Sequence, residues 1–316
     1  MSLREQLEGN LITTSQMKEA IQHSGYLLEQ RVEPIIRESG YYVETNPIFR
    51  DPDTGKSREI DIRALAGVGV YREEGSYIFP TLLCECENNL QPIVFFTSEP
   101  FLSFTFCEDL RVSGIPVKFW NGNQKSFDSL ADFTRMEKFH HYSKGEVATQ
   151  YCTFQLKKDK SSWLAFHSEE QHDTFNSLIK AVDCEVDSHF EDWGLPDQIE
   201  EENINIEIYY PLLILQGALY SAHLENDRLI LRKEKHVQFR KQYFSSYTKE
   251  IETYQIDVIV ESYLSHYLEI IESEIEMIKK IFQRKKTRVF ESIGKIVEEA
   301  KKGGKEADSY RKYLEY

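Results

Sequence analysis

Acidic and apolar residues alternate in two runs of the sequence, REIDIRA at residues 58–64 and LLCECE at residues 82–87. Because successive side chains of a strand point to opposite faces, each run predicts a strand that presents acids on one side. If the two strands pair, the carboxylates of Asp61, Glu85 and Glu87 come close together. Converging carboxylates repel one another unless a cation lies between them. Hard cations such as Mg²⁺ or Mn²⁺ prefer oxygen ligands, so these three acids predict a metal site.

The apolar residues of the same runs predict which faces are buried. Ile60 and Ile62 should point to one side of the first strand, away from Asp61. Cys84 and Cys86 should lie on the apolar face of the second strand. Buried thiols are therefore a better interpretation of these two cysteines than metal ligands.

A cation at this position suits the hydrolysis of a phosphodiester bond. A bound metal polarises the phosphoryl oxygen and lowers the pKa of bound water. We expect Asp61 and Glu85 to hold the ion. Neighbouring carboxylates should raise the pKa of Glu87, which could then take a proton from the water. Asn88 and Gln91 could bind water or phosphate, although capping of the strand end explains them better.

Periodicity predicts the elements that position these acids. Apolar residues spaced three and four apart predict a helix over residues 15–39, and Pro34 should kink this helix or mark a boundary in it. The turn sequence DPDTGK at residues 51–56 predicts a hairpin that joins strands at 42–49 and 59–64.

Further elements follow along the chain. We expect strands at 79–87, 93–97, 115–119, 204–215 and 254–260, a hairpin at 217–232, and a helix at 170–185. Residues 197–205 are acidic and predict a linker. A last helix should run from residue 263 to about residue 301, with a possible break at the basic run 284–288. The predicted strand at 254–260 is apolar apart from Asp257 in its middle.

The arrangement of residues 25–89 resembles the core of the PD-(D/E)XK nuclease superfamily, the restriction-endonuclease-like fold. That core is a helix, a three-stranded meander, a second helix and a further strand, with an acid on the second strand and Glu-x-Lys on the third. The resemblance matches Asp61 to the first position and the Glu-Cys-Glu of residues 85–87 to the second. It also matches Glu29 to a helix position where many members carry a glutamate that supports the metal site.

The chain departs from the family at the lysine, where Glu87 stands. The family lysine is thought to orient or activate the attacking water and to offset charge on the phosphate. Some active members use a glutamate at this position, and inactive relatives also lack the lysine. The resemblance therefore implies a metal-dependent nuclease in DNA repair or defence. The alternative is a catalytically inactive nuclease fold that binds nucleic acid or protein. A plain structural protein, which would bind no metal, is a third interpretation.

For the whole chain we expect an α/β fold. A restriction-endonuclease-like mixed sheet flanked by helices should form residues 1–125. An extension of strands and a long C-terminal helix should form residues 126–316, unless both parts make one domain. The long helix is a candidate interface for a homodimer or another protein partner.

Composition limits the partners. The nucleic-acid partner that we expect is DNA. The formal net charge of −15 opposes tight non-specific binding to it, except through local basic clusters. Those clusters are Lys157, Lys158 and Lys160; Arg232, Lys233, Lys235, Arg240 and Lys241; and Arg284, Lys285, Lys286 and Arg288.

Other signals favour a cytoplasmic protein without membrane association. The apolar runs are too short to span a bilayer, and the N-terminal sequence has no apolar signal core. The five cysteines include no Cys-x-x-Cys pair, which is typical of reduced thiols. His140 and His141 adjoin, but neighbours in sequence seldom bind the same ion. The sequence contains neither a phosphate-binding P-loop nor a Gly-x-Ser-x-Gly elbow.

Overall fold

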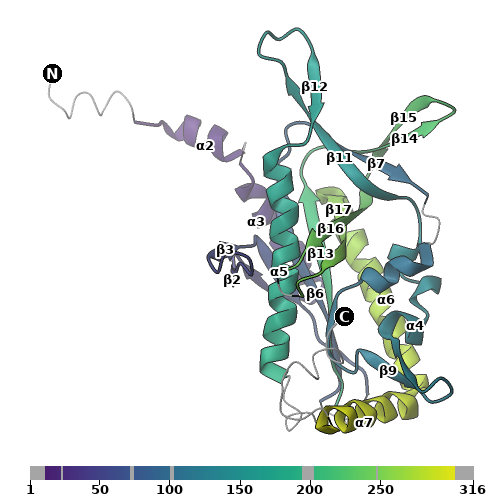
Figure 1. The fold of residues 1–316 in the computed structure, drawn as a ribbon. Coiled ribbons are helices and arrows are strands. Elements are labelled where there is room, and N and C mark those ends of the chain that lie inside the picture. The colour runs from purple at the N-terminus through teal and green to yellow at the C-terminus, as the bar shows by residue number, and fades with distance from the viewer. Residues whose placement is uncertain are drawn as a thin grey trace.

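The computed structural model describes residues 11–22, 24–71, 75–99, 103–193, 203–246 and 248–302. Within these residues, thirteen strands form one mixed sheet with helices on both faces (Figure 1). The order across the sheet is β1 (Tyr42–Thr45), β4 (Ile62–Leu65), β6 (Tyr77–Glu87), β13 (Asn205–Leu215), β17 (Ile251–Val260), β16 (His236–Phe244), β11 (Val147–Leu156), β7 (Ile93–Ser98), β14 (Leu219–Glu225) and β15 (Arg228–Glu234).

Shorter strands pair with the main sheet or with one another. Three of them join the main sheet by pairing with β6, β13 and β11, respectively: β5 (Val68–Gly69), β8 (Val112–Ile115) and β12 (Trp163–Phe166). Two separate pairs are β2 (Ile48–Arg50) with β3 (Ser57–Glu59), and β9 (Lys118–Asn121) with β10 (Ser126–Ser129). The helices are α2 (Thr14–Gln22), α3 (Tyr26–Glu38), α4 (Leu130–Thr134), α5 (Glu169–Trp193), α6 (Leu264–Arg284) and α7 (Lys286–Lys302).

Strand β13 lies at the centre of the fold and is buried on both faces. It runs parallel to β6 on one side and to β17 on the other. Tyr210 and Leu212 face the core that contains α3 and α6, with which α7 also packs. Tyr209 and Leu213 face the core that contains α5. A strand buried on both faces is apolar along its length, which explains why the sequence predicted it well.

The predicted single helix over residues 15–39 is wrong, because the structure has two helices there. They separate at Ser24 and Gly25, while Pro34 lies inside α3. A Cβ atom on Gly25 would approach the backbone oxygen of Cys86 to 3.3 Å. The start of α3 therefore sits tightly against the end of β6, and a side chain at residue 25 would push the two apart.

The predicted hairpin around residues 51–56 is confirmed, with an interruption in each arm. Strand β1 pairs with β4, and β2 pairs with β3. In the turn, Asp51 Oδ1 accepts hydrogen bonds from the backbone N–H groups of Asp53 and Thr54. Lys180 of α5 lies 3.1 Å from Asp51 Oδ2, which fastens the hairpin to the helix.

The prediction that Ile60 and Ile62 share a face is wrong. Ile60 packs in the core next to α5, and Ile62 packs in the core on the other side of the sheet. The alternation fails because β3 ends at Glu59 and β4 begins only at Ile62, so residues 60 and 61 are not part of a strand.

The long C-terminal helix breaks at Lys285, between α6 and α7, within the basic run that predicted a break. The apolar side of α6 is buried within the chain against the sheet and α3. A protein partner of this helix would therefore meet its polar side.

At the level of class, the expected α/β fold with a large mixed sheet flanked by helices is confirmed. Strands from both sides of residue 125 alternate in this sheet. The linker predicted at residues 197–205 lies mostly outside the described residues. All five cysteines are free, with Cys84 and Cys86 buried on the apolar face of β6 as predicted. No helix among the described residues is long and apolar enough to cross a membrane.

Candidate functional site

A cavity of about 380 Å³ opens at the carboxyl end of β6, where the starts of α3 and α5 meet. We call it the acidic pocket, because five of its lining residues are acids. The lining residues are Ser24, Gly25, Tyr26, Glu29, Asp61, Glu85, Cys86, Glu87, Glu170 and Thr174. All four acids predicted from the sequence to form the site, Glu29, Asp61, Glu85 and Glu87, are among them. Among the described residues that line the pocket, none is a lysine, arginine or histidine.

Asp61 reaches the pocket from the bend that precedes β4. The pairing of Ile62 with Cys84 places Asp61 beside Glu85 on the neighbouring strand. Asp61 Oδ2 accepts a hydrogen bond of 2.7 Å from the backbone N–H of Cys86. This bond fixes the carboxylate against β6 although residue 61 itself lies outside a strand.

Glu85 forms the electrostatic centre of the pocket. Burial, followed by the negative charge of Asp61, raises the pKa of Glu85 to about 8, while a hydrogen bond from Ser177 of α5 opposes the shift. Burial also raises the pKa of Asp61, against the opposing hydrogen bond from Cys86. The Asp61 and Glu85 carboxyl groups hydrogen-bond to each other. Near neutral pH this pair therefore holds a proton that a bound cation would replace.

Glu87 is held by α5 and keeps one oxygen free of hydrogen bonds. Its Oε1 atom accepts a 2.6 Å hydrogen bond from Nε2 of Gln171. Its Oε2 atom is buried and has no hydrogen-bond partner. Burial raises the pKa of Glu87, Gln171 lowers it, and the charge of Glu170 raises it further. An unpartnered buried carboxylate oxygen costs free energy, which a cation or a bound water would recover.

Glu29 enters the pocket from α3. Burial and the charge of Asp61 raise the pKa of Glu29, and a hydrogen bond from Asn46 lowers it. Asn88 does not face a ligand, because its side chain donates to the backbone oxygen of Ser24 at 3.3 Å. This bond ties the end of β6 to the segment before α3, and the interpretation of Asn88 as a strand-end cap stays a prediction.

The donor set of the acidic pocket fits a hard divalent cation. Carboxylate oxygens are the ligands that Mg²⁺ and Mn²⁺ prefer. The unpartnered Glu87 oxygen and the proton that Asp61 and Glu85 share both indicate that negative charge in the pocket lacks a cation. Asp61, Glu85 and Glu87 are the residues that would hold the ion. Within the described part of the chain, three ligand atoms come within 4.8 Å of one another at His140, His141 and Glu274. The carboxylate oxygens of the acidic pocket are not grouped so closely.

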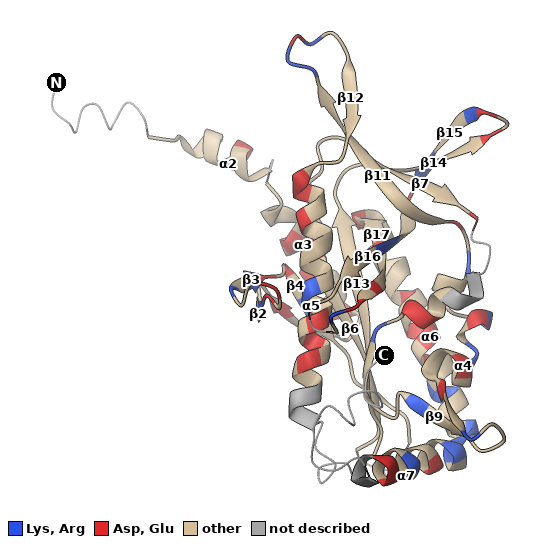
Figure 2. Ribbon diagram, in the orientation of Figure 1, with Lys and Arg blue, Asp and Glu red and all other residues tan. Residues whose placement is uncertain are grey.

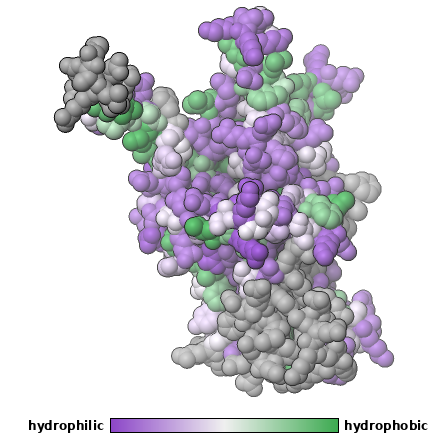
Figure 3. Space-filling view, turned by 60° about the vertical axis from the view of Figure 1, so that its left-hand side comes forward, coloured by the Kyte–Doolittle hydropathy of each residue, from purple (hydrophilic) through white to green (hydrophobic). Residues whose placement is uncertain are grey.

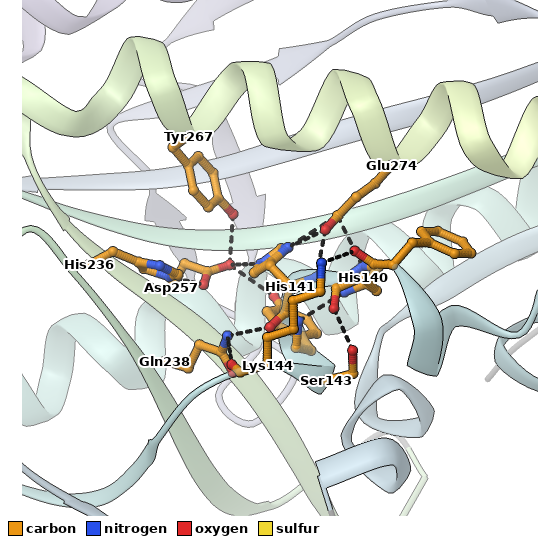
Figure 4. A network of polar contacts seen from close by, with 11 residues as sticks. His140, His141, Ser143, Lys144, His236, Gln238, Asp257, Tyr267 and Glu274 are labelled. Carbon is orange, nitrogen blue, oxygen red and sulfur yellow. Dashed lines mark hydrogen bonds and ion pairs between the residues drawn. The ribbon is translucent and has the colours of Figure 1, made fainter.

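That histidine group belongs to a second buried polar cluster, between β17, α6 and the segment that precedes β11 (Figure 4). His141 Nδ1 lies 2.9 Å from Glu274 Oε1, and His141 Nε2 lies 3.1 Å from Asp257 Oδ2. Tyr267 donates a 2.7 Å hydrogen bond to the same Asp257 oxygen, and His236 Nε2 lies 2.6 Å from the other one.

Burial and the two carboxylates shift the pKa values of the histidines in this cluster in opposite directions. Burial alone would lower the pKa of His141, but Asp257 and Glu274 outweigh it and raise that pKa to about 10. Burial lowers the pKa of His140 to about 4, so its ring is neutral. His140 Nδ1 accepts the backbone N–H of Tyr142, which leaves the ring proton on Nε2. In this state the cluster is an ion triad of one imidazolium and two carboxylates, and His140, His141 and Glu274 form a second candidate metal group.

Several residues of both clusters were not predicted. Gln171, Thr174 and Ser177 come from α5, and no sequence signal separated them from other polar residues of that helix. Asp257 in an apolar strand was the one visible signal of the histidine cluster, because a buried acid needs a partner. Comparisons with family models, curated proteins and solved structures found no match for this chain.

Proposed function

We propose that this chain is a metal-dependent nuclease of the PD-(D/E)XK type, which hydrolyses phosphodiester bonds. The observation that carries the proposal is the convergence of Glu29, Asp61, Glu85 and Glu87 on one pocket. These acids come from three separate segments of the sequence. A random set of surface acids would avoid such convergence, because like charges repel.

The order of the surrounding elements supports the same proposal. Helix α3 is followed by the antiparallel strands β1, β4 and β6. The segment from β7 to β12, which includes α4, comes next in the chain, and then come α5 and β13, which runs parallel to β6. The resemblance to the nuclease superfamily implies this order of a helix, a meander, a helix and a strand. It also implies acids on the second and third strands, and here Asp61 immediately precedes β4 while Glu85 and Glu87 end β6.

Each acid has a distinct part in the proposed chemistry. Asp61 and Glu85 would bind Mg²⁺ or Mn²⁺ once their shared proton leaves. Glu87, with a raised pKa and an orientation set by Gln171, would accept a proton from the attacking water. A cation bound here supplies polarisation of the phosphoryl oxygen and a lower pKa for water. Glu29 would not be a metal ligand and would add negative charge to the pocket.

Contact with a nucleic acid is best supported at the hairpin of β11 and β12. Its turn carries Lys157, Lys158 and Lys160, all exposed, and forms a basic tip on a strongly acidic protein (Figure 2). Strand β12 leads directly into α5, whose first turn includes the pocket residue Glu170. Other predicted basic residues already have partners: Arg288 pairs with Asp128, and Arg240 pairs with Asp109. DNA that touches the hairpin would therefore lie near the mouth of the pocket.

A catalytically inactive binding protein is the second candidate, and one observation favours it. The lining of the acidic pocket, as far as the structure describes it, offers no basic side chain to offset the charge of a phosphate. Such a protein would bind metal and nucleic acid without cleaving either strand.

Cleavage of plasmid DNA and of labelled DNA and RNA oligonucleotides tests the proposal. The matched proteins are wild type, Asp61→Asn, Glu85→Gln and the exposed control Glu225→Gln, each with Mg²⁺, Mn²⁺ or EDTA. We expect cleavage by wild type and the control only with metal, and a loss of at least about 100-fold in the two pocket variants. Wild type that binds but never cleaves would favour the inactive candidate, and equal activity of all variants would assign the cleavage to a contaminant.

A further inference from the structure

The hairpin of β11 and β12 projects beyond the body of the protein (Figure 1). We call residues 155–167 the hairpin end, because every residue in this range is exposed to solvent. Strand β12 is exposed on both faces from Trp163 to Phe166, although its four side chains are aromatic or aliphatic. Apolar side chains that are exposed together and bordered by polar residues are typical of a contact surface for a partner.

The hairpin end has a defined backbone although it stands apart from the core. Strand β12 pairs with β11 along its whole length, and backbone hydrogen bonds of 2.8 and 3.0 Å close the turn between them. At the base of the hairpin, the rings of Tyr151 and His167 stack with their centroids 4.9 Å apart. Tyr151 is buried in the core that contains α5. The exposed side chains are therefore presented on a backbone that is anchored to that core.

Positive charge gathers in the turn of the hairpin end. The turn has one acid, Asp159, and three lysines, Lys157, Lys158 and Lys160, so the hairpin end has a formal net charge of +2 on a chain of −15. Asp159 Oδ1 accepts hydrogen bonds of 3.0 and 2.7 Å from the backbone N–H and the hydroxyl of Ser161. The acid is therefore engaged within the turn, while the lysines are exposed. Figure 3 shows the hydrophilic tip at the top of the molecule, with hydrophobic side chains just beneath it.

Trp163 adds an exposed aromatic ring beside these lysines. The residue is 56% exposed and directly follows Ser162, whose backbone oxygen accepts the N–H of Lys157 across the turn. An indole next to lysines suits a single-stranded nucleic acid, because an unpaired base stacks on the ring while the lysines bind the neighbouring phosphates. In a duplex the flat faces of the bases are stacked on one another, so the ring lacks that partner.

The hairpin end leads to the acidic pocket. Trp163 lies six positions before Glu169, the first residue of α5, so their Cα atoms are at most about 22 Å apart. Helix α5 then contributes Glu170 and Thr174 to the lining of the pocket. Tyr26 also lines the pocket and is 69% exposed, which places a second aromatic ring at its mouth. A strand held at Trp163 is therefore within reach of the pocket.

We propose that the hairpin end binds single-stranded nucleic acid, with Trp163 stacked on an unpaired base and the three lysines on its phosphates. Single strands, or unpaired segments of a duplex, are then the substrate class of the acidic pocket; this assignment rests on the proposed function, whereas the binding itself does not. Anionic lipids also attract lysines and indoles. The neighbouring pocket favours nucleic acid, because its oxygen ligands suit a metal that acts on phosphodiesters.

Fluorescence anisotropy in EDTA tests the binding with labelled strands of about 15 nucleotides, as single-stranded DNA, single-stranded RNA and duplex DNA. The variants are Trp163→Ala, Trp163→Phe and the control Tyr42→Ala, which removes an exposed ring from β1. We expect wild type and the control to prefer single strands. Trp163→Ala should weaken single-strand binding by about 5-fold or more, and Trp163→Phe should keep most of it, because a phenyl ring still stacks. The salt dependence should not change in Trp163→Ala, since no charge is lost.

The outcomes separate this inference from the proposed cleavage. Duplex bound as tightly as single strands, or equal binding by Trp163→Ala and the control, would overturn the role of the hairpin end. Wild type that binds no nucleic acid but sediments with phosphatidylserine vesicles would also overturn it and assign the surface to a membrane. Single-strand binding that needs Trp163, without cleavage in Mg²⁺ or Mn²⁺, would support the hairpin end and contradict the nuclease. Cleavage that is unchanged in Trp163→Ala would support the nuclease and contradict the hairpin end.

Discussion

Glu85 carries much of the electrostatic cost of the acidic pocket. Its carboxyl group is buried beside Asp61 and shares a proton with it. A binding site often lowers the stability of the ligand-free protein, because its charged groups are arranged around a ligand charge that is then absent. At the scale of single residues, the pocket is therefore expected to destabilise the metal-free protein at the pH where that proton is lost.

The substitution Glu85→Gln tests this cost. The pKa of Glu85 rises from 4.5 to about 8 on folding, so the folded state binds the proton more tightly than the unfolded state. Stability from this group is present below pH 4.5 and declines as the pH rises to about 8. Above pH 8 and in EDTA, Glu85→Gln should exceed wild type in free energy of unfolding by about 1 kcal/mol or more.

Urea denaturation at pH 6 and pH 9 measures this difference, with Glu225→Gln as the exposed control. Addition of Mg²⁺ should stabilise wild type and leave Glu85→Gln nearly unchanged. If Glu85→Gln is less stable than wild type at pH 9 without metal, Glu85 is not a strained carboxylate.

At the scale of elements, the histidine cluster joins three parts of the chain that lie far apart in sequence. His141 comes from the segment before β11, Asp257 from β17 and Glu274 from α6. The protonated ring of His141 lies between two buried carboxylates. Removing one partner of a buried ion pair leaves a charge without compensation, at a cost of about 3–5 kcal/mol.

His141→Gln should therefore lower the free energy of unfolding strongly at pH 6, and less at higher pH. The pKa of His141 rises from 6.5 to about 10 on folding. Its contribution is complete below pH 6.5 and is lost as the pH rises to about 10. Chemical denaturation of wild type, His141→Gln and the exposed control His266→Gln at pH 6, 8 and 10 checks this trend. An equal loss at all three pH values would mean that His141 is neutral.

Sequence patterns predicted the elements that obey a simple periodicity. The two-residue alternation located the acids of β6, because that strand is regular from Tyr77 to Glu87. The same alternation failed at Ile60, because the chain bends there and Asp61 is fixed by the backbone of Cys86. The contribution of α5 could not be predicted. Which face of a helix meets a pocket depends on how it crosses the sheet, and a single sequence does not give that crossing.

At the scale of the whole molecule, charge is distributed unevenly. The chain carries a net charge of −15, whereas the turn between β11 and β12 carries three exposed lysines. A nucleic acid would be repelled by most of the surface and attracted at this turn. Binding should therefore be weak overall and unusually dependent on Lys157, Lys158 and Lys160.

Replacing these three lysines with glutamine should weaken DNA binding and reduce its dependence on salt. Each lost phosphate contact lowers the slope of log K against log salt by about 0.9, so the slope should fall by about 2–3. Fluorescence anisotropy in EDTA between low and moderate salt measures it. The matched control replaces three exposed lysines elsewhere, Lys125, Lys138 and Lys249. An equal effect of both triple variants would remove the hairpin from the binding surface.

The central claim is that the four acids form a binding site for a hard cation. Isothermal titration of Mn²⁺ and Mg²⁺ into wild type and Asp61→Asn/Glu85→Gln, at pH 6.5 and 8.5, tests it most directly. We predict binding to wild type that tightens at pH 8.5 and releases a proton at pH 6.5, because the proton shared by Asp61 and Glu85 must leave. We predict no binding to the double variant. Binding that survives the double substitution, or wild type that binds neither ion at either pH, would contradict the account.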